Sequence, residues 1–232
     1  INDTKDRLFS IIGHDLKGPI GNLRQLLDFI NQDIEKGDQQ SVKKILELSQ
    51  ETAKTSFNLL ENLLNWSRSQ LNALSPEPSV FNLSELTKEV TQIYQAALQQ
   101  KNISLTYDFN NAFFVNADKE MISAIIRNLL SNAIKFTPVY GNIFIEIEDN
   151  HDKINLSIKD TGVGIEPARI DKIFDFVKNQ STSGTSGEKG TGLGLQLVRE
   201  FLSLHKTDLQ IDSEKGKGST FSFVLPLASD QQ

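Results

Sequence analysis

Residues 128–136 have the sequence NLLSNAIKF, in which polar and apolar side chains recur with the period of a helix. On a helix Asn128 and Asn132 lie on one face, with Lys135 one turn further along. Amide oxygens suit a magnesium ion that keeps waters and phosphate ligands, and a lysine provides a point charge for phosphate. The alternative is a solvated polar face opposite the apolar residues. The stretch predicts a helix and a candidate phosphate-binding surface.

Two glycine-rich hexapeptides follow: DTGVGI at 160–165, directly after a predicted strand, and GTGLGL at 190–195, directly before a predicted helix. Glycines let backbone N–H groups approach a phosphate closely, and a helix N-terminus adds roughly half a positive charge. We therefore expect phosphates near Leu193–Leu195. Asp160 could accept a hydrogen bond from an exocyclic amine, which adenine has and guanine lacks at that position. Neither hexapeptide is a Walker loop, and the Rossmann pattern is incomplete.

The N-terminal part of the chain has a heptad pattern. Apolar or small residues recur in alternating steps of four and three from Phe9 to Ile34, and a second series runs from Val42 to Leu74. Because the polar stretch 35–40 separates the two series, we predict an antiparallel helical hairpin. A lone hairpin this long cannot cover both apolar stripes, whereas two hairpins can form a four-helix bundle. We therefore expect a homodimer.

The prolines of residues 75–78, SPEP, mark the predicted boundary between a hairpin domain (1–75) and a second domain (76–232). Asn82 and Glu85 have the spacing of a capping box that opens a helix through about Gln100. We predict further strands at Ile103–Phe109, Asn142–Glu148, Ile154–Lys159, Asp208–Asp212 and Thr220–Leu225, and helices near Asp118–Phe136 and Leu193–His205. Their spacing favours an α/β sandwich with helices on one face of a mixed sheet, so the fold class of the whole chain is α+β.

Composition excludes several classes of protein. The 232 residues carry a net charge of −6, which gives no general attraction to nucleic acid or anionic membrane. No cysteine is present, so disulfides and thiolate sites are excluded and a reducing compartment is the default. No apolar run reaches the roughly 18–20 residues of a membrane span. We therefore expect any membrane attachment to lie in segments outside this sequence.

His14 is the histidine with informative neighbours. It follows Gly13, a member of the apolar series, by one position, so a helix would hold its imidazole on the flank of the bundle, near water. The carboxylate of Asp15 could fix the imidazole tautomer and stabilise positive charge on the ring when Nε2 attacks an electrophile. Pro19 removes a helical hydrogen bond about one turn later. His14 is therefore the candidate nucleophile, while a structural role is the default for His151 and His205.

These groups together resemble the sensor histidine kinases of two-component signalling, in the order that the family has them and over essentially the whole chain. The phosphoacceptor motif of the family is similar to residues 9–19, its N box to 128–136 and its G1 box to 160–164. Its F box is similar to residues 173–176, its G2 box to 190–194 and its last glycine segment to 216–221. Any one motif could arise by chance, but this set in this order is specific.

The resemblance implies a Bergerat ATP-binding fold, as in gyrase-type ATPases and certain chaperones, with ATP and Mg²⁺ as cofactors. Asn132 matches the magnesium-binding asparagine, Asp160 matches the adenine-reading aspartate, and residues 176–189 match the ATP lid. The implied catalytic residues are His14 and Asp15. The implied ATP-binding residues are Asn128, Asn132, Lys135, Asp160, Gly162, Gly164, Gly190, Thr191, Gly192, Leu193, Gly194 and Thr220.

The resemblance predicts an ATP-dependent kinase that autophosphorylates His14 and passes the phosphoryl group to an aspartate of a response regulator receiver domain. It also implies that the chain is the cytoplasmic portion of a membrane-anchored bacterial sensor. Two alternatives stay open: a dimeric scaffold that binds ATP without transferring phosphate, and a gyrase-class ATP hydrolase. The hydrolases use a glutamate to activate water where this chain has Asn128, which cannot serve as that base. Two departures from the family pattern are Gly18, where many members carry threonine or asparagine, and the lack of a proline after Phe176.

Overall fold

A computed structural model describes residues 17–36, 38–50, 52–53, 56, 75–107, 111–150, 152–170, 173–174, 184–188 and 194–228. The chain divides into two compact units, residues 1–73 and 74–232. Of the predicted site residues, His14, Asp15, Gly190, Thr191, Gly192 and Leu193 lie outside the described residues. No helix in the described part of the chain combines the length and apolar character that a membrane span requires.

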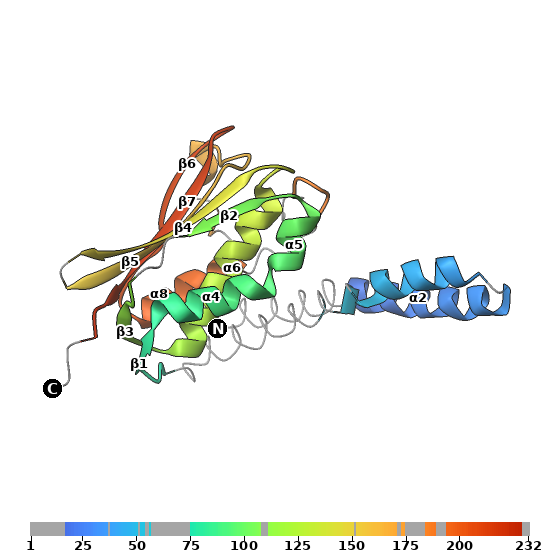
Figure 1. Cartoon of the computed structure of the whole chain (residues 1–232), viewed down its shortest axis with the longest axis horizontal. Coiled ribbons are helices and arrows are strands. Elements are labelled where there is room, and N and C mark those ends of the chain that lie inside the picture. The colour runs from blue at the N-terminus through green and yellow to red at the C-terminus, as the bar shows by residue number, and fades with distance from the viewer. Residues whose placement is uncertain are drawn as a thin grey trace, which may run out of the picture. The chain divides into compact units, whose positions relative to one another are not determined.

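The N-terminal unit contains helix α2 (Lys17–Lys36) and a second helical stretch over residues 39–50 (Figure 1). Asp38 begins the second stretch: its Oδ1 accepts from the Ser41 N–H at 3.1 Å and its Oδ2 from the Ser41 hydroxyl at 2.8 Å. An aspartate in this position satisfies N–H groups that a helix start leaves unpaired. The change from one helix to the next therefore falls within the polar stretch 35–40.

The C-terminal unit is built on a five-stranded sheet of order β2-β4-β5-β7-β6. Its strands are β2 (Ser104–Tyr107), β4 (Asn142–Asn150), β5 (Lys153–Asp160), β6 (Gln210–Glu214) and β7 (Gly218–Pro226). Strand β2 is parallel to β4 and the other pairs are antiparallel, which makes the sheet mixed. The described helices of the C-terminal unit are α4 (Leu83–Ile93), α5 (Gln95–Gln100), α6 (Lys119–Phe136), α7 (Pro167–Ile170) and α8 (Gly194–Leu204).

The main core lies between one face of this sheet and helices α4, α6 and α8 (Figure 1). Alternate residues of the central strands point into it, because successive side chains of a strand face opposite sides. On β5 these are Ile154, Leu156 and Ile158, all at most 1 % exposed. Asp160 is the next residue in that register, opposite Ile143 of β4 and Ser219 of β7. The strand therefore ends by placing a carboxylate where its earlier positions place apolar side chains.

The sandwich with helices on one face of a mixed sheet is confirmed, and the structure adds details that the sequence did not predict. The helix expected from Asn82 to Gln100 is interrupted at Tyr94, whose hydroxyl donates to the Arg127 carbonyl of α6 at 3.3 Å. Strands β1 (Ser79–Asn82) and β3 (Phe114–Ala117) form a separate antiparallel pair. Neither of these two strands was predicted from the sequence.

Candidate functional site

Helix α6 presents the polar residues of the 128–136 stretch. Asp118 caps the helix start, its Oδ1 accepting from the Met121 N–H at 3.0 Å. The apolar face of the helix is buried, with Ile122, Ile125, Ile126, Leu129 and Leu130 all 0 % exposed. Asn128, Asn132 and Lys135 remain half-buried. The helix therefore separates an apolar side that packs on the sheet from a polar side that is open to a ligand.

One end of this polar face contacts the start of helix α8. The Asn128 Nδ2 donates to the Ala124 carbonyl at 2.8 Å, which orients the amide. A Cβ at Gly194, the first residue of α8, would lie 2.6 Å from Asn128 Oδ1. A side chain at position 194 would therefore collide with the amide. The glycine lets the N-terminal end of α8, with its partial positive charge, approach the amide side chain of α6.

The other end of the polar face contacts the turn after β5. The Val163 N–H donates to the Phe136 carbonyl at 3.2 Å. A Cβ at Gly162 would lie 2.5 Å from Asp160 Oδ1 and 2.6 Å from the Phe136 carbonyl oxygen, so only glycine fits there. Gly164 has φ +64°, a conformation that favours glycine. The described part of both glycine-rich segments therefore meets α6, and Asn132 lies between the two contacts.

One of the two carboxylate oxygens of Asp160 accepts hydrogen bonds from residues that the structure describes. Oδ1 accepts from the Gly162 N–H at 2.8 Å and from the Ser219 N–H at 3.3 Å. Oδ2 accepts no hydrogen bond from any residue that the structure describes. Burial raises the pKa of Asp160 to about 6, although the two backbone N–H groups act in the opposite direction. The residue offers a buried, oriented acceptor for a ligand N–H group.

The strand register brings Ser219, and not Thr220, to Asp160. Ser219 pairs with Asp160, whereas Thr220 pairs with Lys159 and Asp212 and so faces the other side of the sheet. The Ser219 hydroxyl lies 2.9 Å from that of Ser213. The expected ATP-binding role of Thr220 therefore has no support from its position. Alternation counted from Asp160 across the pairing of β5 and β7 would have found Ser219, but the sequence does not give that pairing.

Lys135 lies at the end of the polar face next to Phe136, with its ammonium 4.7 Å from the centre of the Phe136 ring. Burial lowers the pKa of Lys135, and the nearby carboxylate of Glu188 raises it in part. A lysine held between an aromatic face and a carboxylate can contribute positive charge to a bound polyanion. The position fits the phosphate role expected from the sequence.

Replacing Asp160 with asparagine is expected to change how stability depends on pH. Because the pKa of this carboxyl rises from its ordinary 3.8 to about 6 on folding, the folded chain binds the proton more tightly than the unfolded chain. Asp160 therefore lowers the free energy of unfolding as pH rises from about 4 to 6, by roughly 3 kcal/mol in total. Urea unfolding of both proteins from pH 4 to 7.5 would measure this. A difference between them that stays constant with pH would contradict the raised pKa.

Comparisons with known proteins show which proteins this chain is similar to. Residues 117–229 match the family described as histidine kinase-, DNA gyrase B- and HSP90-like ATPase, which defines the class of the C-terminal unit. The adaptive-response sensory kinase SasA of Synechocystis is 30% identical over 96% of this chain, and the chain spans 59% of that relative's length. The catalytic domain of histidine kinase ThkA is 31% identical, with a TM-score of 0.57 over 65% of this chain and 98% of that domain.

A further structure is that of ThkA in complex with a response regulator protein. It is similar in fold to 98% of the present chain, with 21% identity and a TM-score of 0.59. That match covers 65% of the ThkA chain. The chain carries the catalytic domain of a sensor histidine kinase, as the sequence motifs predicted.

Proposed function

We propose that this chain is the ATP-dependent protein-histidine kinase part of a two-component sensor. The observation that carries the proposal is the buried carboxylate of Asp160, which holds Oδ1 on two backbone N–H groups and leaves Oδ2 for a ligand. This acceptor lies on the helix-covered face of the sheet, and the turn that follows it contacts α6. An exocyclic amine, as in adenine, supplies the matching donor.

The polar face of α6 would bind the phosphate end of the nucleotide. Lys135 supplies positive charge there, and the start of α8 lies beside Asn128. The Asn132 amide makes no hydrogen bond with any residue that the structure describes and is half-buried, so its oxygen fits a Mg²⁺ ion that keeps waters and phosphate oxygens as its other ligands. Such an ion neutralises phosphate charge when bound. Asn128 would order water and phosphate on the same face.

The phosphoryl group would pass to His14. Nε2 of the imidazole attacks the γ-phosphorus in line, a P–N bond forms, the bond to the bridging oxygen breaks and ADP leaves. The attack makes the ring positively charged, and the carboxylate of Asp15 stabilises that charge until the Nδ1 proton is lost. An aspartate of a response regulator then takes the phosphoryl group from His14. The ThkA complex with a response regulator protein supports this choice of partner by analogy of fold.

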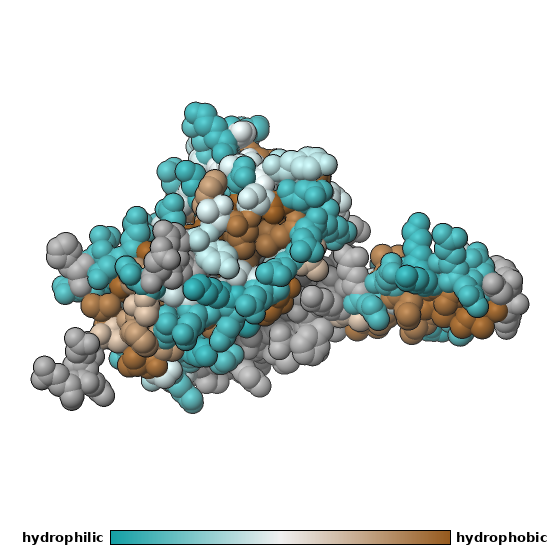
Figure 2. All heavy atoms as spheres, viewed as in Figure 1, coloured by the Kyte–Doolittle hydropathy of each residue, from teal (hydrophilic) through white to brown (hydrophobic). Residues whose placement is uncertain are grey.

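The hairpin would dimerise through its exposed apolar side chains. In α2 and residues 39–50, Leu23, Ile30, Val42 and Ile45 are half-buried. Other apolar residues of the unit remain exposed, and Figure 2 shows an apolar band along this unit; they include Ile20 (51 %), Leu27 (50 %), Ile34 (60 %) and Leu46 (47 %). Covering such a stripe with a second hairpin removes apolar surface from water. A homodimeric four-helix bundle on the cytoplasmic side of a membrane-anchored sensor is the arrangement we propose.

Incubation with γ-³²P-labelled ATP and Mg²⁺ tests the proposed function directly. A histidine kinase incorporates label that is labile to acid and stable to base, because a P–N bond hydrolyses when protonated. A scaffold that only binds ATP incorporates none. A gyrase-class hydrolase releases labelled phosphate without labelling the protein, and Asn128 in place of a glutamate base argues against it.

Gly18 is expected to make the chain a weak phosphatase toward its regulator while the kinase activity stays intact. In the histidine kinase family, the members that dephosphorylate their regulator usually have a threonine or asparagine four residues after the histidine, where its side chain can orient a water. Gly18, in α2 directly before Pro19, has no side chain for this. Decay of the phosphorylated cognate regulator after removal of ATP would measure it, with Gly18→Asn expected to speed the decay. Rapid decay with the unmodified chain would refute the prediction.

A further inference from the structure

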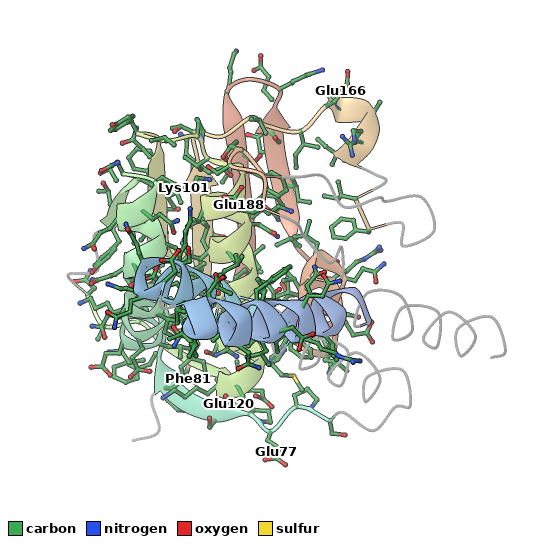
Figure 3. The ribbon with its side chains drawn as sticks, turned by 90° about the vertical axis from the view of Figure 1, so that its right-hand side faces the viewer. Glu77, Phe81, Lys101, Glu120, Glu166 and Glu188 are labelled. Atoms are coloured by element: carbon green, nitrogen blue, oxygen red, sulfur yellow. The ribbon has the colours of Figure 1, made fainter. Side chains whose placement is uncertain are left out.

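Lys101 is a buried cation for which the proposed function gives no role. It caps the C-terminal end of α5, is 7 % exposed, and lies beside Glu188 in Figure 3. Its ammonium donates to four oxygens. They are the carbonyls of Ile134 at 2.7 Å and Lys135 at 3.2 Å, the Thr185 hydroxyl at 2.8 Å and Glu188 Oε1 at 2.9 Å. Burying a lysine at this level requires such complete pairing.

The four acceptors belong to two different parts of the chain. The carbonyls of Ile134 and Lys135 are at the end of α6, where the helix leaves carbonyl groups unpaired and carries partial negative charge. Thr185 and Glu188 belong to residues 184–188. In the sequence, Thr185 is 84 positions and Glu188 is 87 positions from Lys101. A single ammonium therefore joins this segment to the end of the helix that carries Lys135. We call Lys101, Thr185 and Glu188 the Lys101 cluster.

Residues 184–188 are folded around the same contacts. The Glu188 carbonyl accepts from the Gly184 N–H at 2.8 Å, and Glu188 Oε2 accepts from the Ser186 N–H at 2.8 Å. The Thr185 N–H donates to the Lys135 carbonyl at 3.0 Å, and its hydroxyl is 2.8 Å from the Thr137 carbonyl. The segment thus depends on one carboxylate and one hydroxyl that both pair with Lys101.

The placement of this segment matters for the nucleotide site. Glu188 and Gly194 are six positions apart, and Gly194 contacts Asn128 at the other end of the polar face of α6. The Lys101 cluster therefore holds residues 184–188 next to Lys135, while Gly194 lies next to Asn128. We propose that Lys101 is a positioning residue that holds residues 184–188 and Lys135 in place for nucleotide binding. This inference rests on the proposed function of the site.

The test compares the full chain with Lys101→Met, which keeps the length of the side chain and removes its charge, and with Glu188→Gln. Lys153→Met is the matched control, because Lys153 is an exposed residue at the opposite end of β5 from Asp160. Binding of Mg-ADP by titration calorimetry and KM and kcat for autophosphorylation are the functional readouts. We expect the dissociation constant and KM to rise about tenfold in Lys101→Met, less in Glu188→Gln, and not in the control.

Two further measurements separate positioning from general stability. Hydrogen exchange of the Thr185 and Ser186 amides, without nucleotide, is expected to be at least about tenfold faster in Lys101→Met while the α6 amides stay protected. In Lys101→Ala, added ethylammonium is expected to restore nucleotide affinity in part, because it can occupy the space of the missing ammonium. Lower melting temperature with unchanged affinity, unchanged exchange at residues 185–186, or failure of rescue would each overturn the proposal. Failure of the proposed function would instead appear in the unmodified chain, as no binding or no labelling.

Discussion

His14→Gln is expected to abolish incorporation of the γ-phosphate of ATP while ATP binding persists. Glutamine is close to histidine in size and polarity, but its amide nitrogen is not nucleophilic, so no P–N bond can form. The affinity should stay within about twofold of the parent, because the proposed acceptor and the proposed pocket belong to different units of the chain. Labelling with γ-³²P-ATP and titration with Mg-ADP, both on the purified full chain, measure the two effects.

His151→Gln is the matched control, because it removes another of the three histidines of the chain outside every motif of the family. It should incorporate as much label as the parent. Acid-labile, base-stable label that survives in His14→Gln would assign the phosphoacceptor to a different residue. Loss of both labelling and nucleotide binding in His14→Gln would indicate that the change had damaged the protein as a whole.

Asp160→Ala and Asn132→Ala are expected to weaken Mg-nucleotide binding by roughly tenfold to a hundredfold, which corresponds to about 1–3 kcal/mol. In Asp160→Ala the base loses its acceptor, and the N–H groups of Gly162 and Ser219 lose theirs. In Asn132→Ala the effect should depend on Mg²⁺, since the amide is proposed to bind the ion. Titrations with ADP in the presence and absence of Mg²⁺ separate these two causes.

Thr220→Ala tests the strand register in the same experiment. Thr220 is on β7 next to Ser219, but its side chain faces the other side of the sheet, so its truncation should leave nucleotide affinity unchanged. A loss as large as that of Asp160→Ala would show that the pairing of β5 and β7 is shifted by one residue. Unchanged affinity and unchanged autophosphorylation in both Asp160→Ala and Asn132→Ala would refute the proposed pocket.

Much of the fold was predictable because it depends on local periodicity. The helix around Asn128 and Asn132 and the alternation in β5 are both patterns within one segment. The carboxylate of Asp160 and the glycines that follow it were also recognisable, since the residues required at a tight turn next to a ligand are few. The break at Tyr94 was not, because it coincides with a hydrogen bond to Arg127 on another helix.

The candidate site likewise has some features that a single segment of sequence predicts and others that depend on contacts between elements. The sequence shows which segments carry the polar and glycine-rich residues, and their order is that of a histidine kinase. The tertiary structure was needed to show that Ser219 and not Thr220 adjoins Asp160, because a shift of one residue in strand pairing turns a side chain to the other face of the sheet. It also decided that Lys101 meets Glu188. That contact joins residues 87 positions apart, and only the packing of α5 beside the end of α6 brings the ammonium to its acceptors.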